Sequence, residues 1–347
     1  MTLFPTQPNI PSPTTAARPV AVPAPGVSAP LGADDAKRAR ILADAIRARF
    51  AQTLVGQDNL RESLIVTLVA GGHILIESVP GLAKTTAAQT LATCVSGSFK
   101  RVQCTPDLMP SDLVGTQVFD FASQKFTTQI GPIHANFVLL DEINRSNAKT
   151  QSAMLEIMEE RQVTADGATY KLERPFMVLA TQNPIDSLGT YKLPDAQIDR
   201  FMIKISLGYP SFEDEMAVIL SGRKAKAEIA PTINAQQVVA LIEQARRVCV
   251  DRTVAAYIVR MVEATRTHAD IKLGASPRGS IALYCLSRAY ALSRGRNYVL
   301  PDDVKFLAPY VLAHRIILTH GAKTEKKDPA QIIRTIVGQV VVPTGTK

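Results

Sequence analysis

Three short apolar runs alternate with helical stretches in the first two thirds of this chain, and each run leads into polar residues. The runs cover residues 73–77, 137–140 and 175–180. Strands that alternate with helices predict a parallel sheet with helices on both faces. Ligands of such α/β folds bind at the carboxyl ends of the strands. The residues that follow each run are therefore the first candidates for a functional site.

The pattern changes near Tyr209-Pro210, where strand signals end. Apolar residues at near 3.6 spacing predict helices from residue 34 onward and over residues 57–71. Beyond the break we predict four helices, over residues 234–247, 252–268, 277–294 and 301–314. We expect an α/β domain over residues 34–208 and an all-helical domain over residues 209–347. At roughly 150 residues per domain, the length of 347 residues fits two domains.

Residues 1–33 differ in composition from the rest of the chain. They contain eight prolines and a single charged side chain, Arg18. Each proline removes a backbone donor, and the segment has little apolar bulk to offset the entropy of ordering. We predict a disordered arm, which acts either as a solubilising tail or as a docking peptide for a partner.

Composition and charge exclude several classes of protein. With 46% hydrophobic and 20% charged residues, the chain is neither wholly disordered nor collagen-like. The apolar runs fall far short of the roughly 20 residues that a membrane-spanning helix needs, so we predict no membrane insertion. The net charge of +8 is spread along the sequence and gives only weak support for nucleic-acid binding.

Cysteine usage and the N-terminus indicate the compartment. The four cysteines lie in apolar segments without C-x-x-C spacing, which argues against a zinc site and a disulfide scaffold. No basic start followed by an apolar stretch indicates a secretory signal. We therefore expect reduced core cysteines in a cytoplasmic protein. The cysteines are Cys94, Cys104, Cys249 and Cys285.

The loop after the first apolar run is suited to phosphate binding. It comprises Ser78, Val79, Pro80, Gly81, Leu82, Ala83, Lys84, Thr85 and Thr86. Backbone N–H groups and the positive end of a helix dipole meet at such a loop, and both attract a polyphosphate. Lys84 is expected to reach the terminal phosphates, and the Thr85 hydroxyl to ligate magnesium. Ser78 and Ala83 replace the glycines of the strict pattern, so a turn with a capping lysine stays open as an alternative.

The second and third runs end in further groups suited to phosphoryl transfer. Asp141 and Glu142 follow the second run, where the first carboxylate can hold magnesium through its water shell and the second can polarise the attacking water. Asn183 follows the third run and can hold that water in line without a change of charge. A solvent-facing strand end and an Asn-Pro turn are the respective alternatives.

Two other features complete the set. Arg200 lies between a predicted helix end and a new strand, where it can neutralise transition-state charge in a neighbouring subunit or simply pair with Asp199 or Asp195. Residues 105–131 carry several aspartates and an alternating stretch, which predict an inserted hairpin or loop.

These residues together resemble the MoxR family of AAA+ ATPases. The resemblance runs from about residue 37 to the C-terminus, and it rests on the loop 78–86 and on a set of ordered motifs. The motifs are Thr105-Pro106-Asp107, Gly131-Pro132-Ile133, Asp141-Glu142-Ile143-Asn144-Arg145, Asn183-Pro184 and Asp199-Arg200-Phe201. Alanine before the P-loop lysine also occurs in that family, whereas Ser78 departs from its usual glycine.

The resemblance implies an AAA+ core with a helical lid, and it assigns roles to single residues. It implies a Walker A role for Lys84 and Thr85, Walker B for Asp141 and Glu142, sensor 1 for Asn183 and an arginine finger at Arg200. It further implies sensor 2 at Arg278, directed back toward the phosphates from the first turn of a helix. Arg145 is either a second intersubunit arginine or a surface charge. The segment 105–131 matches the helix-2 insert and is expected to line the pore or substrate face.

The resemblance also implies ligands and partners. They are ATP with Mg²⁺, a homo-oligomeric ring, expected to be hexameric, and a protein client, with a von Willebrand factor A domain protein as one candidate. Chaperone-like remodelling of that client is the expected activity. Two rival functions remain open: a nucleic-acid motor or loader, supported by the charge and the arginine-rich helix near residues 37–49, and a weakly hydrolysing nucleotide-dependent scaffold, suggested by Ser78.

Overall fold

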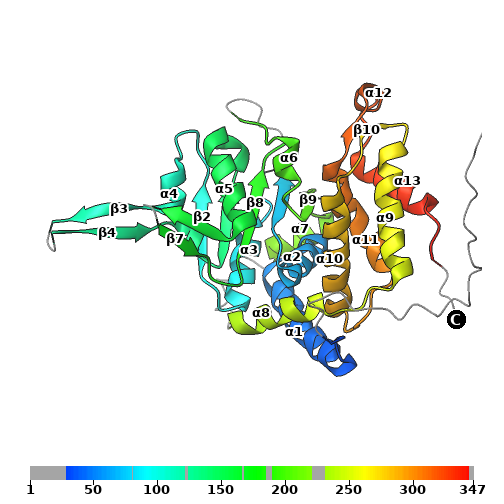
Figure 1. Ribbon diagram of the computed structural model, residues 1–347, viewed down its shortest axis with the longest axis horizontal. Helices are drawn as coiled ribbons and strands as arrows, with labels where there is room; N and C mark the ends of the chain where they lie inside the picture. The colour runs from blue at the N-terminus through cyan, green and yellow to red at the C-terminus, as the bar shows by residue number, and fades with distance from the viewer. Residues whose placement is uncertain are drawn as a thin grey trace, which may run out of the picture.

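A five-stranded parallel sheet forms the centre of the first domain (Figure 1). The computed structural model describes residues 29–79, 81–121, 124–165, 168–184, 190–220 and 231–343. The sheet order is β2-β5-β8-β1-β9, and every neighbouring pair is parallel. The strands are β1 (Ile74–Ser78), β2 (Phe99–Gln103), β5 (Phe137–Asp141), β8 (Met177–Gln182) and β9 (Ile203–Leu207). The predicted α/β class is confirmed.

The three central strands coincide with the three predicted apolar runs. Strands β1, β5 and β8 are buried on both faces, as expected of a parallel sheet covered by helices. On one face Ile74 and Ile76 pack in a core with α1 (Ala33–Thr53), α2 (Asp58–Ala70) and α3 (Lys84–Cys94). On the other face Leu75 packs with α5 (Ala148–Glu160).

The edge strand β2 was not among the predicted runs. Lys100, Arg101 and Gln103 are exposed on this strand, and only Val102 is buried. A strand with polar residues at three of its five positions lacks the continuous apolar signal that marks the buried strands. Its carboxyl end nonetheless lies next to that of β5, where Gln103 pairs in register with Asp141.

The predicted insert between residues 105 and 131 is a short helix followed by a hairpin. Helix α4 (Pro110–Val114) leads into the antiparallel strands β3 (Gly115–Asp120) and β4 (Lys125–Ile130). Figure 1 shows this hairpin projecting from the end of the molecule that is remote from α9 and α13. A second hairpin, β6 (Gln162–Ala165) and β7 (Ala168–Lys171), follows α5 and was not predicted.

The second domain is helical, as predicted. Its elements are α7 (Phe212–Leu220), α8 (Ala235–Arg246), α9 (Arg252–Thr267), α10 (Pro277–Ser293), α11 (Pro301–Leu312), α12 (His320–Thr324) and α13 (Pro329–Gln339). A short antiparallel ladder of β10 (Ile271–Leu273) and β11 (Ile317–Leu318) joins them. Helix α10 packs against α2 and α1 of the first domain as well as α8, α9 and α11. The helical domain therefore shares one continuous apolar core with the sheet domain.

The predicted disordered arm extends too far toward the first helix. Residues 1–28 lie outside the described residues, but Leu31 is 2% exposed, and α1 already begins at Ala33. The backbone oxygens of Ala29 and Leu31 accept hydrogen bonds from Arg247 and Asn297. Residues 29–33 therefore belong to the folded chain, because a buried leucine and two polar contacts anchor them to the helical domain.

The structure also bears on the expected absence of membrane-spanning helices and on the burial of the four cysteines. Among the described helices, none combines the length and the apolar character that crossing a membrane requires. Cys94 and Cys104 are buried, as expected for core cysteines, whereas Cys285 is partly buried and Cys249 is exposed. The expectation that all four cysteines lie in the core is therefore wrong for Cys249, which precedes the N-cap of α9.

Candidate functional site

The loop between β1 and α3 has the backbone geometry of a phosphate cradle. Gly81 and Ala83 adopt positive φ angles of 89° and 54°, so the chain turns tightly just before α3 begins at Lys84. A Cβ added at Gly81 meets nothing within 4 Å, which leaves open space above the loop. The first N–H groups of α3 and its positive dipole end face this turn. Pro80 lies outside the described residues.

One buried polar side chain of this loop lacks a hydrogen-bond partner among the described residues. The Lys84 ammonium lies 3.5 Å from the carbonyl oxygens of both Ser78 and Val79, so it folds over the loop. Ser78 is buried, and within the described residues its hydroxyl has no hydrogen-bond partner. A buried hydroxyl without a partner is costly unless a ligand or water satisfies it. Leu82 is also buried, Thr85 is half-buried, and Ala83 and Thr86 are exposed.

Asp141 ends β5 at the same edge of the sheet and is held from two sides. It is buried, and its carboxylate accepts a hydrogen bond of 2.6 Å from the Thr181 hydroxyl. The Arg101 guanidinium donates to the other carboxylate oxygen through Nε at 3.1 Å and Nη2 at 2.7 Å. These contacts fix the orientation of the Asp141 carboxylate at the carboxyl end of the strand.

Glu142 leaves the strand in a left-handed conformation with a φ of 58°. Its N–H donates to the Thr181 hydroxyl at 2.9 Å. Its carboxylate accepts from Arg145 Nε at 2.9 Å and from Gln103 Nε2 at 3.3 Å. A non-glycine residue in this backbone region costs free energy, and such strain concentrates at functional sites. The turn separates Glu142 from Asp141, so that the two adjacent carboxylates have different partners.

Asn183 is the third group at this edge. It follows β8, which lies between β5 and β1 in the sheet, and it is buried. Asn144, which follows the two carboxylates, is buried beside it, with its amide nitrogen 3.5 Å from the Asn183 carbonyl oxygen. The Asn144 side-chain oxygen has no partner within the described residues. Parallel topology thus brings the carboxyl ends of three strands and their polar residues to one edge.

A cavity of about 400 Å³ lies at the end of β9, the strand that pairs with β1. The connection between α1 and α2 and the end of β9 form its walls. Its lining residues are Gly56, Gln57, Asp58, Asn59, Ser206, Leu207, Gly208, Tyr209 and Asp214. Leu207 pairs in register with Ser78, the first residue of the loop. A volume of this size at the carboxyl edge of an α/β sheet suits a small organic ligand.

The residues present fit ATP and Mg²⁺. Backbone N–H groups and the Lys84 ammonium lie at the loop, and a buried hydroxyl without a partner among the described residues lies within it. A cavity lies at the end of the adjacent strand β9. Within the described residues no group of three or more His, Cys, Asp or Glu is arranged to hold a metal. Magnesium typically takes one or two protein oxygens and completes its shell with phosphates and water. Asp141 and Thr85 offer oxygens of that kind.

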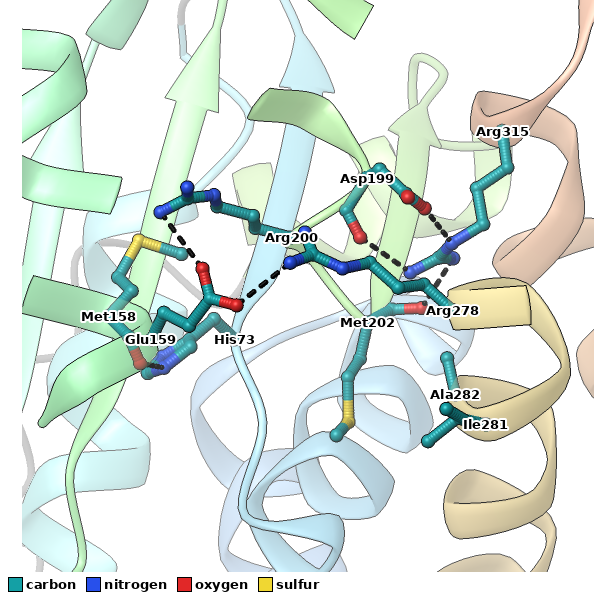
Figure 2. Close-up of a pocket in the computed structure, with 10 residues that line it drawn as sticks. All are labelled: His73, Met158, Glu159, Asp199, Arg200, Met202, Arg278, Ile281, Ala282 and Arg315. Atoms are coloured by element: carbon teal, nitrogen blue, oxygen red, sulfur yellow. Dashed lines mark hydrogen bonds and ion pairs between the residues drawn. The ribbon is translucent and has the colours of Figure 1, made fainter. Parts of the chain in front are cut away.

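Arg200 and Arg278 both point toward Glu159 in a second cluster of side chains (Figure 2). Arg200 precedes β9, and Arg278 is in the first turn of α10. The carboxylate of Glu159 joins them, at 3.2 Å from Arg200 Nη1 and 2.8 Å from Arg278 Nη2. With His73, which precedes β1, they line a cavity of about 170 Å³ at the amino ends of the strands.

This placement corrects the expectation for Arg278. The phosphate loop follows the carboxyl end of β1, whereas the cavity at Arg278 includes His73 at its amino end. A strand of five residues is about 16 Å long. Arg278 therefore does not point toward the loop of its own subunit, because the docking of α10 on α2 turns it to the edge that carries Arg200.

A buried ion pair joins the loop of Arg200 to the helical domain. The Arg315 guanidinium, 2% exposed, donates to the Asp199 carboxylate at 2.7 Å and to the Phe201 carbonyl at 2.7 Å. The Ser276 hydroxyl, the N-cap of α10, donates to the other Asp199 oxygen at 3.0 Å. Burial lowers the pKa of Arg315 to about 10, although the Asp199 charge acts in the opposite direction. Asp199 thus links the segment that carries Arg200 to the N-terminus of α10, which carries Arg278.

His73 lies beneath the same cavity as a neutral imidazole. Val178 N–H donates to Nδ1 at 2.9 Å, so Nε2 carries the proton and donates to the Met158 carbonyl at 3.1 Å. Burial, with the nearby Arg161 charge, lowers the pKa of His73 to about 4. The ring is thus a structural bridge between β8 and α5 rather than a proton carrier.

Sequence reasoning missed several residues of these two clusters, among them Arg315, the buried partner of Asp199. Thr181 lies in the run before Asn183 and was given no role, although a polar residue within a buried strand was a usable signal. Arg101 and Gln103 lie on the edge strand that the periodicity did not indicate. Glu159 lies in the last turn of α5, where nothing in the local sequence reveals a partner.

Comparisons with known proteins agree with this geometry. Residues 73–203 match the ATPase family associated with various cellular activities (AAA), and residues 263–336 match the AAA lid domain. The chain is 44% identical to YeaC of Bacillus subtilis over 84% of this chain and 92% of that protein. It is 43% identical to Chaperone MoxR1 of Mycobacterium tuberculosis over 84% and 79% of the respective chains. A crystal structure from Cytophaga hutchinsonii superposes with a TM-score of 0.84 at 40% identity, covering 90% of this chain and 98% of that one.

Proposed function

Because this chain belongs to the MoxR family of AAA+ ATPases, we propose that it forms a ring of like subunits, hydrolyses ATP at their interfaces and thereby remodels protein partners. Family membership makes the chain an ATPase. The assembly, which we expect to be a hexamer, and the division of roles among its residues belong to the proposal.

The carboxyl edge of the sheet is the proposed nucleotide site. Lys84 and the first N–H groups of α3 bind the terminal phosphates, and the base enters the cavity beside Leu207. Thr85 and Asp141 hold Mg²⁺, which supplies charge neutralisation on the phosphates. Glu142 accepts the proton of the attacking water, and Asn183 orients that water. The left-handed turn at Glu142 supports this division, because it separates the base from the metal-holding carboxylate.

The pairing of Arg200 and Arg278 at the amino ends of the strands is the observation that most supports assembly of the subunits into a ring. Both guanidinium groups are joined through Glu159 and line a cavity with His73, which precedes β1, whereas the phosphate loop follows the other end of β1. Neither is placed to contact its own nucleotide, yet arginines of this kind stabilise the charge that develops in phosphoryl transfer. We therefore assign both arginines to the nucleotide of the neighbouring subunit.

A subunit-mixing experiment tests this assignment. Lys84→Ala disables the nucleotide site of a subunit, whereas Arg200→Ala and Arg278→Ala each remove an arginine that the subunit supplies to its neighbour. Each variant alone is expected to lose at least about 90% of ATPase activity. Mixing Lys84→Ala with either arginine variant is expected to restore activity, because some interfaces then combine an intact site with an intact arginine pair.

Mixing the two arginine variants with each other provides the matched control. No interface in that mixture contains both arginines, so activity stays low if both act on the neighbour. Recovery in this mixture contradicts the assignment of Arg278, because it requires that Arg278 serve its own subunit. Undiminished activity of Arg200→Ala alone contradicts the ring-dependent mechanism altogether.

The projecting hairpin is the proposed contact to the protein client. Val118 and Phe119 on β3 are exposed, and Phe121 at its tip is 86% exposed. Exposed aromatic and aliphatic side chains on a projecting element suit a protein surface better than a nucleic acid, which requires a basic groove. A von Willebrand factor A domain protein is the candidate client that we retain. Salt-sensitive DNA binding with DNA-stimulated ATPase activity argues instead for the nucleic-acid motor.

A further inference from the structure

The Glu159 carboxylate occupies the position between two arginines that come from different domains. Arg200 belongs to the sheet domain and Arg278 to α10, and they approach different oxygens of Glu159 (Figure 2). Arg278 donates a hydrogen bond to Glu159, whereas Arg200 forms an ion pair with it and donates its hydrogen bond to the Leu155 carbonyl at 2.7 Å. A carboxylate and a phosphate use the same charge-assisted, two-oxygen recognition by guanidinium groups. The arrangement is that of an anion site filled by a residue of its own chain.

The location of Glu159 on its helix is unfavourable in itself. It lies in the last turn of α5, which ends at Glu160, and that turn contains no basic residue. Carboxylates destabilise a helix C-terminus because the dipole is negative there. The two arginines therefore supply the positive charge that compensates the Glu159 carboxylate at this position.

The ion pairs of Glu159 are also weaker than those of Asp199. Glu159 is 45% exposed, and exposed ion pairs contribute little to stability. Asp199 is instead bound by the buried guanidinium of Arg315 and by Ser276. The structure thus combines Asp199, whose partner is buried and which joins the two elements that carry the arginines, with Glu159, which is exposed enough to be displaced.

We propose that Glu159 is an exchangeable counter-ion, which leaves the arginines when the terminal phosphate of a neighbouring subunit's nucleotide takes its place. This inference rests on the proposed function, because it assumes that Arg200 and Arg278 act across the interface. Glu159 thereby opposes premature assembly: an incoming nucleotide must compete with it. The adjoining cavity of about 170 Å³ provides the space into which the incoming phosphate extends.

The test measures nucleotide-dependent assembly rather than turnover. The full chain carries Glu142→Gln so that bound ATP persists, and sedimentation velocity follows self-association as ATP with Mg²⁺ is added. Glu159→Gln removes the charge and keeps the shape. It is expected to lower the ATP concentration for half-maximal assembly about three- to tenfold, since the competing ion pairs are lost. Glu159→Ala is expected to act in the same direction.

Glu160→Gln is the matched control, because it removes a charge from the same helix turn at a residue that does not line the cavity. It is expected to leave the assembly midpoint unchanged. If Glu159→Gln assembles at the same ATP concentration as its parent, or requires more, the inference is wrong. Arg200→Ala in the same background distinguishes a failure of the proposed function from a failure of the inference about Glu159. If Arg200→Ala assembles like its parent, the proposed function is wrong. If Arg200→Ala assembles poorly but Glu159→Gln has the same assembly midpoint as its parent, only the role of Glu159 is wrong.

Discussion

The Thr181 hydroxyl donates a hydrogen bond of 2.6 Å to the Asp141 carboxylate and at the same time accepts one of 2.9 Å from the N–H of Glu142. One side chain of β8 thus sets both the orientation of Asp141 and the backbone turn at Glu142. Thr181 is a positioning residue, since it holds two groups of the proposed site without itself lying in the phosphate loop.

Thr181→Val keeps the shape of the side chain and removes its hydroxyl. We expect kcat to fall about 10- to 100-fold, because small displacements of catalytic groups carry costs of this size. ATP binding should change little, since Lys84 and the loop are untouched. Thr181→Ser serves as the control and should recover most of the activity. Steady-state ATPase assays with parallel ATP-binding measurements check this, and unchanged kcat in Thr181→Val contradicts the positioning role.

Glu142→Gln and Lys84→Ala should separate turnover from binding. Glu142→Gln is expected to bind ATP normally and to reduce kcat at least about 100-fold, because a glutamine cannot accept the proton of the attacking water. Lys84→Ala should lose measurable ATP binding, because the ammonium at the loop is removed. Calorimetry with ATP and Mg²⁺ and a phosphate-release assay provide the two readouts. Normal hydrolysis by Glu142→Gln excludes Glu142 as the base.

Asp199→Asn should destabilise the fold as well as the site. The substitution leaves the Arg315 guanidinium, which is 2% exposed, without its anionic partner. Breaking a buried ion pair by removal of one member costs about 3 kcal/mol or more. Chemical denaturation measures the loss. The double variant Asp199→Asn with Arg315→Met should be less destabilised than the sum of the single variants, and strict additivity argues against a coupled pair.

The lowered pKa of His73 leads us to expect a loss of folding stability in mild acid. Its pKa is lowered from 6.5 to about 4 by burial, so the unfolded chain binds the proton more readily than the folded one. Stability is therefore unaffected above pH 6.5 and decreases as the pH falls from 6.5 toward 4, by up to about 3 kcal/mol from this residue. Burial also lowers the pKa of His314, which adds a loss in the same direction.

Unfolding free energies measured between pH 7 and pH 5 check this expectation. His73→Gln retains one donor and one acceptor but cannot take up a proton in this range. Its stability at pH 7 is expected to be lower, yet its dependence on pH should be shallower than that of the parent. Parallel curves for the two proteins contradict a neutral buried His73.

The sequence by itself determined those features that depend on neighbouring residues in the chain. Apolar runs that lead into Ser78, Asp141 and Asn183 predicted three parallel strands and the edge at which their polar residues meet. Strand–loop–helix order predicted the phosphate loop at Lys84, and ordered motifs indicated the family. Each of these follows from local spacing, because periodicity and turn chemistry act over only a few residues.

Only the tertiary structure decided which distant side chains meet. The exposed polar strand β2 gave no apolar signal, so the contact of Arg101 with Asp141 was not predictable. The N-terminal turn of α10 was evident from Ser276 and Pro277, but its docking against α2 determines that Arg278 faces Arg200 and Glu159 instead of its own phosphate loop. The direction in which a helix presents a charge depends on the packing of two domains, and that packing is the sum of many long-range apolar contacts that no local pattern contains.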